Sequence, residues 1–362
     1  MLMYLYPFFA ALFVTSLIVV TKPLHMHMTA KSRNMSARQS LHIIPTPRVG
    51  GLSLVIGYIV GMFFLPVDVF DLTMLLGIST IPVFLGGFGE DVGFDVSSTK
   101  RLILSFISAV LAILVFQTWV TDVGLSYLWF MTYGTFGSLV FTIVLTGGIS
   151  HSINLIDGLN GLSMGVSMMI SLGLAGLAYS FEDYSILMMC GVVLSSVAGL
   201  FIFNFPFGKI FLGDAGAYSM GHVLTWIGIL LISRNPEIAP FSVMLLFFWP
   251  VMDMLFAIYR RLRTGRRLDQ PDRLHFHQLV MRGLELVFFG KKKRNWSNPL
   301  ATMIILPMAA TPIVTAQFVY QSDRASVVSF GVFLILFVLT YLAGMAWARR
   351  WAKVGTRRTS VR

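Results

Sequence analysis

The segment FTIVLTGGISHSINLIDGLNGLSMGVSMMISLGLAGLAYS, residues 141–180, joins two long apolar runs through a short polar turn. A run of about 20 apolar residues has the length that a helix needs to cross the roughly 30 Å hydrocarbon core of a bilayer. The segment therefore predicts two membrane helices and, between them, a loop that carries Asn154, Asp157 and Asn160.

The composition of the whole chain is that of a membrane protein. Of its 362 residues, 56% are hydrophobic and 12% are charged, and the mean hydropathy is +0.79. These values lie outside the range of soluble proteins. We therefore predict an all-α integral membrane protein that forms a single polytopic domain over residues 1–362, with about eleven transmembrane helices. The apolar runs are 3–20, 49–67, 72–88, 102–119, 127–146, 162–180, 185–203, 217–233, 239–259, 299–320 and 327–348.

The basic residues mark every second connecting segment. Of the 27 Lys and Arg residues, 25 fall in 21–48, 88–101, 260–298, at Lys209 or in the tail after Trp347. Because cytoplasmic loops are enriched in Lys and Arg, we expect the N-terminus outside and the C-terminus in the cytoplasm. Orientation and contact with anionic membrane lipid account for the net charge of +11, so we expect no nucleic-acid partner.

The unusual polar stretches all fall in these basic connecting segments. We therefore expect them to meet on one membrane face and to form an active site in the cytoplasmic loops. They are HIIPTPRVGG (42–51), GEDVGFDVSSTKR (89–101), SHSINLIDGLNG (150–161), NFPFGKIFLGDAGAYSMG (204–221) and RRLRTGRRLDQPDRLHFHQLVMRG (260–283).

The residue types in these loops suit a diphosphate and a divalent metal. Carboxylates hold Mg²⁺ together with water and substrate phosphates, and Arg, Lys and His bind phosphate oxygens. Glycines just before a helix let backbone N–H groups approach an anion. The acids are Glu90, Asp91, Asp157 and Asp214; the phosphate-binding candidates are Arg48, Lys100, Arg101, His275 and His277; Gly213 is one of the glycines.

Each of these pieces also has an ordinary structural interpretation. The DG, NG and GDAG sequences are common turn and helix-cap chemistry, so NLIDGLNGL alone is as compatible with a loop as with a site. His275 and His277 lack further ligands at zinc spacing. Asp253 lies inside an apolar run, where it is either a functional group or half of an ion pair near the helix end, seven residues before Arg260.

Five motifs, in order along the chain, resemble those of the polyprenyl-phosphate N-acetylaminosugar-1-phosphate transferases, glycosyltransferase family 4. The resemblance covers residues 40 to 285, the expected catalytic core, and leaves two helices and a basic tail in 286–362. Eleven spans and an outside N-terminus are similar to the branch that starts O-antigen chains. The motifs are PTPRVGG (45–51), GEDVGFDVSSTKRLILSF (89–106), NLIDGLNGL (154–162), IFLGDAGAYSMG (210–221) and DRLHFHQLVMRG (272–283).

The resemblance implies a reaction at the bacterial cytoplasmic (inner) membrane. The phosphate of undecaprenyl phosphate would attack a UDP-N-acetylaminosugar, release UMP and leave a lipid-linked sugar diphosphate, the first membrane step of O-antigen or another surface polysaccharide. Mg²⁺ is the implied ion, with Mn²⁺ as an alternative, and a homodimer is compatible with the sequence. The alternatives are lipid I synthesis, by phospho-MurNAc-pentapeptide transfer, and, in another class, a secondary transporter, which usually carries its ionisable residues at the bilayer midplane.

The resemblance also assigns roles to particular residues. Asp214 would bind Mg²⁺, with Asp157 as a second ligand, and Asp91 would deprotonate or orient the lipid phosphate in a direct attack, supported by Glu90. The lipid tail would lie in an apolar groove between helices. The residues expected to bind substrate are His42, Arg48, Lys100, Arg101, Asn154, Asp157, Asn160 and Gly213, and the catalytic histidines are His275 and His277.

The sequence departs from the family pattern at three positions. Glu90 replaces the first Asp of the usual pair, so the essential acid is assigned to Asp91. Asn160 stands where lipid I synthases carry an acid, and Gln278 stands where a third histidine often lies. These two departures favour the surface-polysaccharide branch.

Overall fold

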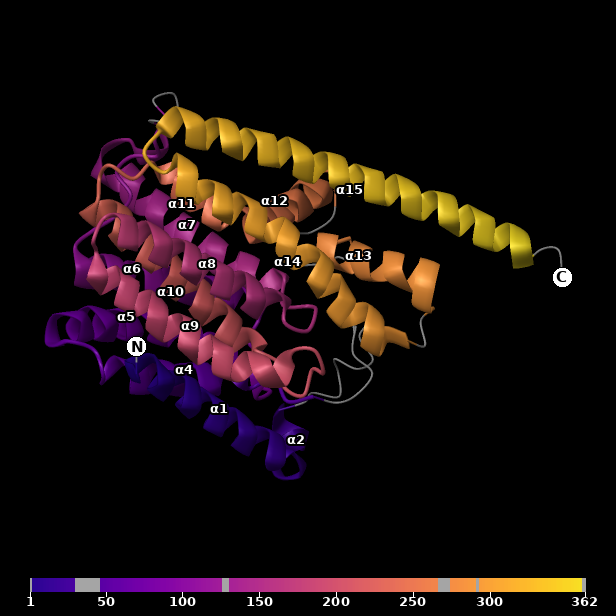
Figure 1. Cartoon of the computed structure of the whole chain (residues 1–362), viewed down its shortest axis with the longest axis horizontal. Coiled ribbons are helices and arrows are strands. Elements are labelled where there is room, and N and C mark those ends of the chain that lie inside the picture. Colours follow the sequence, from indigo (N-terminus) through magenta and orange to yellow (C-terminus); the bar gives the residue numbers. More distant parts are fainter. Residues whose placement is uncertain (1, 30–45, 126–129, 266–273, 291–292, 360–362) are drawn as a thin grey trace.

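The computed structural model describes residues 2–29, 46–125, 130–265, 274–290 and 293–359, and the side chains of 27–29 and 348–359 lie outside this description. Over these residues the chain is a bundle of helices without a strand (Figure 1), which confirms the predicted all-α class. The elements are η1 (Leu2–Tyr4), α1 (Leu5–Val20), α2 (Lys22–Thr29), α4 (Gly50–Met62), α5 (Val67–Asp91), α6 (Ser98–Phe116), α7 (Gly134–Leu155), α8 (Leu162–Ser180), α9 (Tyr184–Asn204), α10 (Gly213–Arg234), α11 (Pro240–Leu246), α12 (Phe248–Arg263), α13 (Phe276–Leu284), η3 (Glu285–Phe289), α14 (Arg294–Val319) and α15 (Asp323–Thr359).

The described helices make a multi-pass membrane protein with fewer full spans than expected. Nine helices of the described chain are long and apolar enough to cross a bilayer, or ten if a bent pair counts as one span. The run 49–67 contains only the 13 residues of α4. Helix α4 ends early because Pro66 disfavours helical backbone at the residue before it, and Pro66 then precedes the first turn of α5.

The run 239–259 is broken rather than continuous. Helices α11 and α12 meet at Phe247 with a bend of 82°. Pro250 lies in the first turn of α12 and has no N–H to donate to the carbonyl of Leu246, so a helix cannot continue through this point. The break changes the direction of α12, and Asp253 lies on this helix.

Helix α10 is the centre of the bundle. It packs against α5, α7, α4 and α8, and 94% of its most apolar stretch is buried. Small residues let the neighbouring backbones come close: a Cβ on Gly51 or on Gly87 would lie 2.5 Å from the backbone nitrogen of Gly216 or Ala215. The first turn of α10 is therefore held tightly between α4 and α5.

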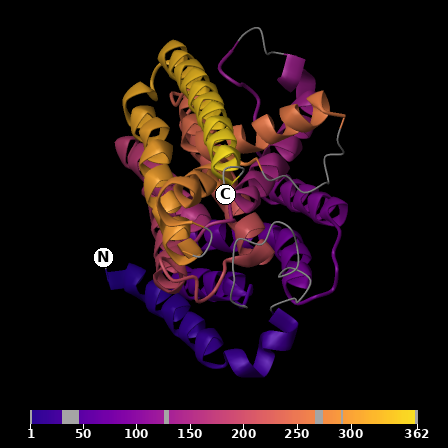
Figure 2. The same ribbon diagram turned by 90° about the vertical axis from the view of Figure 1, so that its right-hand side faces the viewer.

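The first and last helices flank this core on opposite sides. Both views place α1 and α2 at one side of the bundle and α15 at the other (Figures 1 and 2). Only 11% of the apolar stretch of α15 is buried, and the helix runs past the body of the molecule (Figure 1). The polar motifs lie between these flanks, where α5, α7, α9 and α12 end and α6, α8 and α10 begin.

Candidate active site

The first turn of α10 is closed by a carboxylate from α5. Asp91 is 3% exposed, and its Oδ1 and Oδ2 accept the backbone N–H groups of Asp214 and Ala215, both at 2.9 Å. A buried anion at a helix N-terminus satisfies free N–H groups and interacts favourably with the helix dipole. Gly213 has φ +76°, and a Cβ there would collide with the Arg48 carbonyl and Asp91, so the close approach requires glycine.

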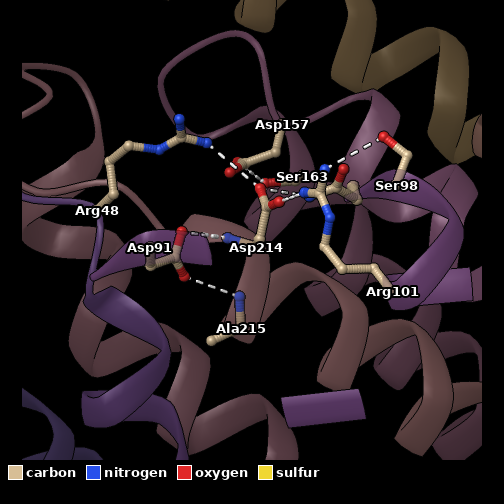
Figure 3. A network of polar contacts seen from close by, with 9 residues as sticks. Arg48, Asp91, Ser98, Arg101, Asp157, Ser163, Asp214 and Ala215 are labelled. Atoms are coloured by element: carbon tan, nitrogen blue, oxygen red, sulfur yellow. Dashed lines mark hydrogen bonds and ion pairs between the residues drawn. The ribbon is translucent and has the colours of Figure 1, made fainter. Parts of the chain in front are cut away.

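Asp214 is the point at which four elements meet (Figure 3). Its Oδ1 accepts from Arg48 Nη2 at 3.3 Å and from Asn154 Nδ2 at 3.1 Å. Its Oδ2 forms an ion pair with Arg101 Nη1. The two guanidinium groups offset the charge of this buried carboxylate, and guanidinium groups also bind phosphate oxygens.

Arg48 is positioned by strand-like pairing between residues 46–51 and 208–212. Phe211 N–H donates to the Pro47 carbonyl at 2.9 Å, and Gly50 N–H donates back to the Phe211 carbonyl at 3.0 Å. Gly51 N–H donates to the Leu212 carbonyl at 2.8 Å. These bonds tie the PTPRVGG segment to the GDAG segment, so the two motifs form one unit.

Asp157 lies in the turn between α7 and α8 (Figure 3). Burial raises its pKa to about 6, although the Ser163 hydroxyl, which donates to Oδ1, and the Arg48 guanidinium both lower it. The carboxylate is therefore ionised only above about pH 6, unless a cation binds beside it.

Asn160 binds the protein on three sides. Its N–H donates to Asn298 Oδ1 at 2.8 Å, its Nδ2 donates to the Pro206 carbonyl at 2.8 Å, and its carbonyl accepts from Thr302 Oγ1 at 2.8 Å. These bonds tie the turn to α14 and to the loop before α10. Its Oδ1 is buried without a hydrogen-bond partner among the described groups, and a bond from Asn160 to substrate stays a prediction.

The histidine motif packs against α12. His275 Nδ1 lies 3.3 Å from Asp253 Oδ2, and His277 Nδ1 lies 3.5 Å from the same oxygen. Both histidines are buried, at 4% and 1% exposed. On its other edge, the His277 ring meets the NLIDGLNGL turn, because a Cβ on Gly158 would lie 2.6 Å from His277 Nε2.

The structure gathers most of the predicted site, with three exceptions. His42 lies outside the described residues. Lys100 is exposed at the start of α6, where its backbone N–H donates to Ser97 Oγ at 3.3 Å. Glu90 is half-buried beside Asp91, at the end of α5.

The expectation that the polar site residues lie in loops is wrong for three of them. Asp91 ends α5, Asn154 lies in the last turn of α7, and Asp214 lies in the first turn of α10. Helices α5 and α10 run further than their apolar runs where the end of α5 caps the start of α10, a contact that hydropathy does not show.

Three further residues belong to this neighbourhood. Tyr218 lies one turn after Asp214, and its ring centroid is 5.8 Å from the Arg101 guanidinium carbon. Ser163 donates to Asp157, and Asp253 holds the histidines. Asp253 alone carries a clear signal in the sequence, as an acid inside an apolar run, but its partners are His275 and His277 rather than the suggested Arg260. The Arg260 guanidinium lies over the rings of Phe256 and Tyr341.

The donor set fits a hard divalent cation that also binds substrate. The described residues contain no group of three or more His, Cys, Asp or Glu side chains arranged to hold a metal by themselves. Mg²⁺ needs fewer protein ligands, because it usually keeps several waters and binds one or two carboxylates plus substrate phosphates. Asp214 and Asp157, both within reach of Arg48, offer oxygens of this kind.

A family model matches residues 73–232, which run from α5 to the last turn of α10 and contain Asp91, Asp157 and Asp214. The model describes glycosyl transferase family 4. This part of the chain is similar to glycosyl transferase family 4. The match confirms the resemblance drawn from the five motifs.

Relatives extend the family 4 similarity beyond this segment. The chain is 27% identical over 313 residues to the undecaprenyl-phosphate alpha-N-acetylglucosaminyl 1-phosphate transferase of Yersinia pestis, across 84% of this chain and 81% of the relative. It is 25% identical to the protein of the same name from Escherichia coli (strain K12), across 84% and 80%. A Bacillus subtilis (strain 168) protein, named a probable undecaprenyl-phosphate N-acetylglucosaminyl 1-phosphate transferase, is 26% identical across 68% of each chain.

Proposed function

We propose that this family 4 chain transfers N-acetylglucosamine 1-phosphate from UDP-N-acetylglucosamine to undecaprenyl phosphate, with release of UMP. The observation that carries the proposal is the Asp214 cluster, in which Arg48, Arg101 and Asn154 converge on one carboxylate at the start of α10. The relatives named for this reaction support the lipid acceptor and the sugar. They favour neither lipid I synthesis nor transport.

Phosphoryl transfer needs positioning and charge stabilisation more than covalent chemistry, and the cluster supplies both. Asp214 and Asp157 would hold Mg²⁺, which when bound neutralises charge on the diphosphate and acts as a Lewis acid. Arg48 and Arg101, which pair with Asp214 in this structure, are then free to bind phosphate oxygens. Asn154 stays beside the carboxylate and orients it.

The geometry favours a positioning role for Asp91. Both of its carboxylate oxygens already accept N–H groups of α10. The second pKa of a phosphate monoester is near 6, so the lipid phosphate is mostly a dianion at neutral pH and needs no strong base. Asp91 would instead fix the first turn of α10 and so the place of Asp214, and the phosphate would attack directly.

The charge distribution supports a position for this site on the cytoplasmic side of the bacterial inner membrane. Arg48, Lys100 and Arg101 belong to the connecting segments that hold 25 of the 27 basic residues. The undecaprenyl chain would remain in the bilayer while its phosphate reaches the cluster. This orientation gives the enzyme access to a soluble nucleotide sugar and a membrane-bound acceptor at one surface.

The test is UMP release by the purified full-length protein with undecaprenyl phosphate, Mg²⁺ and either UDP-N-acetylglucosamine or UDP-MurNAc-pentapeptide. We expect release with the first donor only, and loss of it in Asp214→Asn. The matched control is Asp183→Asn, which removes another buried acid that is paired with Arg234 at 2.9 Å. Lipid-independent release, or full activity of Asp214→Asn, would contradict the proposal.

A further inference from the structure

Asp253 is a buried acid that lies against one backbone N–H group and two histidine rings. It is 0% exposed on α12, a setting in which an unpaired carboxylate would be strongly destabilising. Its Oδ1 accepts the Phe276 backbone N–H at 3.0 Å. Its Oδ2 faces two imidazoles, His275 Nδ1 at 3.3 Å and His277 Nδ1 at 3.5 Å. One carboxylate therefore binds the start of α13 and His275 through hydrogen bonds. It also forms a longer contact with His277 Nδ1, which makes no hydrogen bond among the described groups.

An ionised carboxylate only accepts hydrogen bonds, so a neutral imidazole that faces it does so with a protonated nitrogen. Nδ1 then carries the proton, and Nε2 carries a lone pair on the far edge of the ring. In His277 that far edge points at the NLIDGLNGL turn, where a Cβ on Gly158 would lie 2.6 Å from Nε2. The His277 ring thus lies between Asp253 and Gly158, which directly follows Asp157 in the chain.

We infer that Asp253 is a positioning residue, which fixes His275 and His277 in the Nδ1-protonated form and directs His277 Nε2 toward the turn that carries Asp157. The importance of this arrangement for sugar-phosphate transfer rests on the proposed function. The arrangement itself is a property of the resting protein and is measured without substrate.

Two features distinguish this role from simple packing. The two imidazoles are stacked, with centroids 5.6 Å apart and planes 19° from parallel, and the Nδ1 atoms of both rings face the same Asp253 oxygen. The His277 ring is also fixed at both edges, by Asp253 on one side and by the Gly158 backbone on the other. Rotation of the ring would place a nitrogen or carbon of different character against the turn.

The first experiment reads the proton directly, by ¹⁵N NMR of the detergent-solubilised full chain with labelled histidine. His275→Gln and His277→Gln assign the signals. We expect both rings to be protonated at Nδ1, and Asp253→Asn to move at least one of them to the Nε2-protonated form, because an amide N–H must face a lone pair. Asp183→Asn should leave the histidine signals unchanged. An Nε2-protonated His277 in the parent protein, or signals that Asp253→Asn leaves unmoved, would overturn the inference.

The second experiment separates a positioning role from a structural one by kinetics. Replacing an orienting aspartate by asparagine keeps the shape but reverses the histidine tautomer, and loss of such a supporting partner typically costs about 10- to 100-fold in activity. We expect Asp253→Asn to lower kcat by that amount while the KM for the UDP-sugar changes little. In the His275→Gln/His277→Gln background the same substitution should have almost no further effect.

A purely structural Asp253 would give the opposite kinetic pattern. Asp253→Asn would then reduce activity by the same factor in the parent protein and in the His275→Gln/His277→Gln background, and it would lower the thermal stability in both. That result would overturn the inference even if UMP release itself is confirmed. If no variant or parent protein releases UMP, the NMR result still decides the inference, so its failure and that of the proposed function are distinguishable.

Discussion

Gly158 is the residue at which the histidine motif and the NLIDGLNGL turn touch. An alanine Cβ there would lie 2.6 Å from His277 Nε2, and the ring cannot retreat because it is 1% exposed and Asp253 lies behind it. Gly158→Ala should therefore displace the turn. Because displacements near 1 Å can cost about 10²-fold in catalysis, we expect at least a tenfold loss of UMP release.

The matched control for this substitution is Gly148→Ala on α7, where the new Cβ would lie 3.7 Å from Met254 Cε, an ordinary contact. This variant should keep its activity, since alanine also favours helix more than glycine does. Equal activity of the two variants would show that the turn and His277 are not in tight contact.

Asp157 gives the site a pH dependence whose sign follows from burial. Because burial raises its pKa to about 6, the carboxyl is protonated below that pH, and Mg²⁺ must then displace a proton to bind it. We expect the Mg²⁺ concentration for half-maximal UMP release to be constant above about pH 7. It should rise by roughly tenfold per pH unit below about pH 6.

Ser163→Ala tests the origin of this pH dependence. The hydroxyl donates to Asp157 Oδ1 and lowers its pKa, so its removal should raise the pKa and move the onset of the Mg²⁺ effect to higher pH. A midpoint near pH 4 in the parent protein, or one that Ser163→Ala leaves in place, would mean that Asp157 is not the titrating ligand.

The pairing of Asp253 with the histidines shows which residue contacts the sequence does not predict. An acid inside an apolar run predicts that a partner exists. Its identity depends on how α13 folds back onto α12 from 22 residues away, whereas the sequence points to the nearer Arg260. Asp214, by contrast, is predicted to share a site with Arg48, Arg101 and Asn154, because all four lie in motifs of the basic connecting segments.

At the scale of elements, α5 caps α10. Both oxygens of Asp91 accept N–H groups from the first turn of α10, and a hydrogen bond of this kind contributes about 1 kcal/mol. Asp91→Ala would leave two buried N–H groups unpaired. We expect a lower melting temperature in detergent together with loss of UMP release, since Asp214 lies in the same turn.

Asp183 provides the comparison at the start of α9, where it accepts the Ile186 N–H at 3.2 Å. Asp183→Ala should also lower the melting temperature, but the variant should retain UMP release. Asp183 lies at the start of α9 and pairs with Arg234 at the end of α10, whereas Asp214 lies at the start of α10. If Asp91→Ala melts like the parent protein and loses only activity, Asp91 acts on substrate rather than on α10.

The same capping explains why hydropathy predicts where the helices lie but not where they end. Apolar runs locate every long helix because apolar side chains favour the hydrocarbon core, where the backbone must form its hydrogen bonds within a helix. The helix ends are set by other elements: α5 extends to Asp91, beyond the run ending at 88, where it meets α10. The break between α11 and α12 also escapes hydropathy, although Pro250 marks it once prolines are considered.

At the scale of the whole molecule, the gathering of the polar motifs at one end of the bundle follows from alternating helices. Arg48, Arg101 and Asn154 come from different parts of the chain and meet at the Asp214 carboxylate. Asp91 binds the backbone of the same turn (Figure 3). Charge alone assigns this end to the cytoplasm. The sidedness is therefore the property of the whole molecule most in need of measurement.

Helix α6 offers a matched pair of positions for that measurement. Thr99 lies in its first turn, near Arg101 and the site, and Thr121 lies just beyond its far end; both are exposed. The single natural cysteine, Cys190, is 1% exposed, so the parent chain serves as the unlabelled control. We expect a membrane-impermeant maleimide to label Thr121→Cys on intact cells, and Thr99→Cys only after the cells are permeabilised. The reverse pattern would put the Asp214 cluster outside the cell, away from cytoplasmic nucleotide sugars, and would remove the physical basis for the proposed transferase even though each contact in the site were correct.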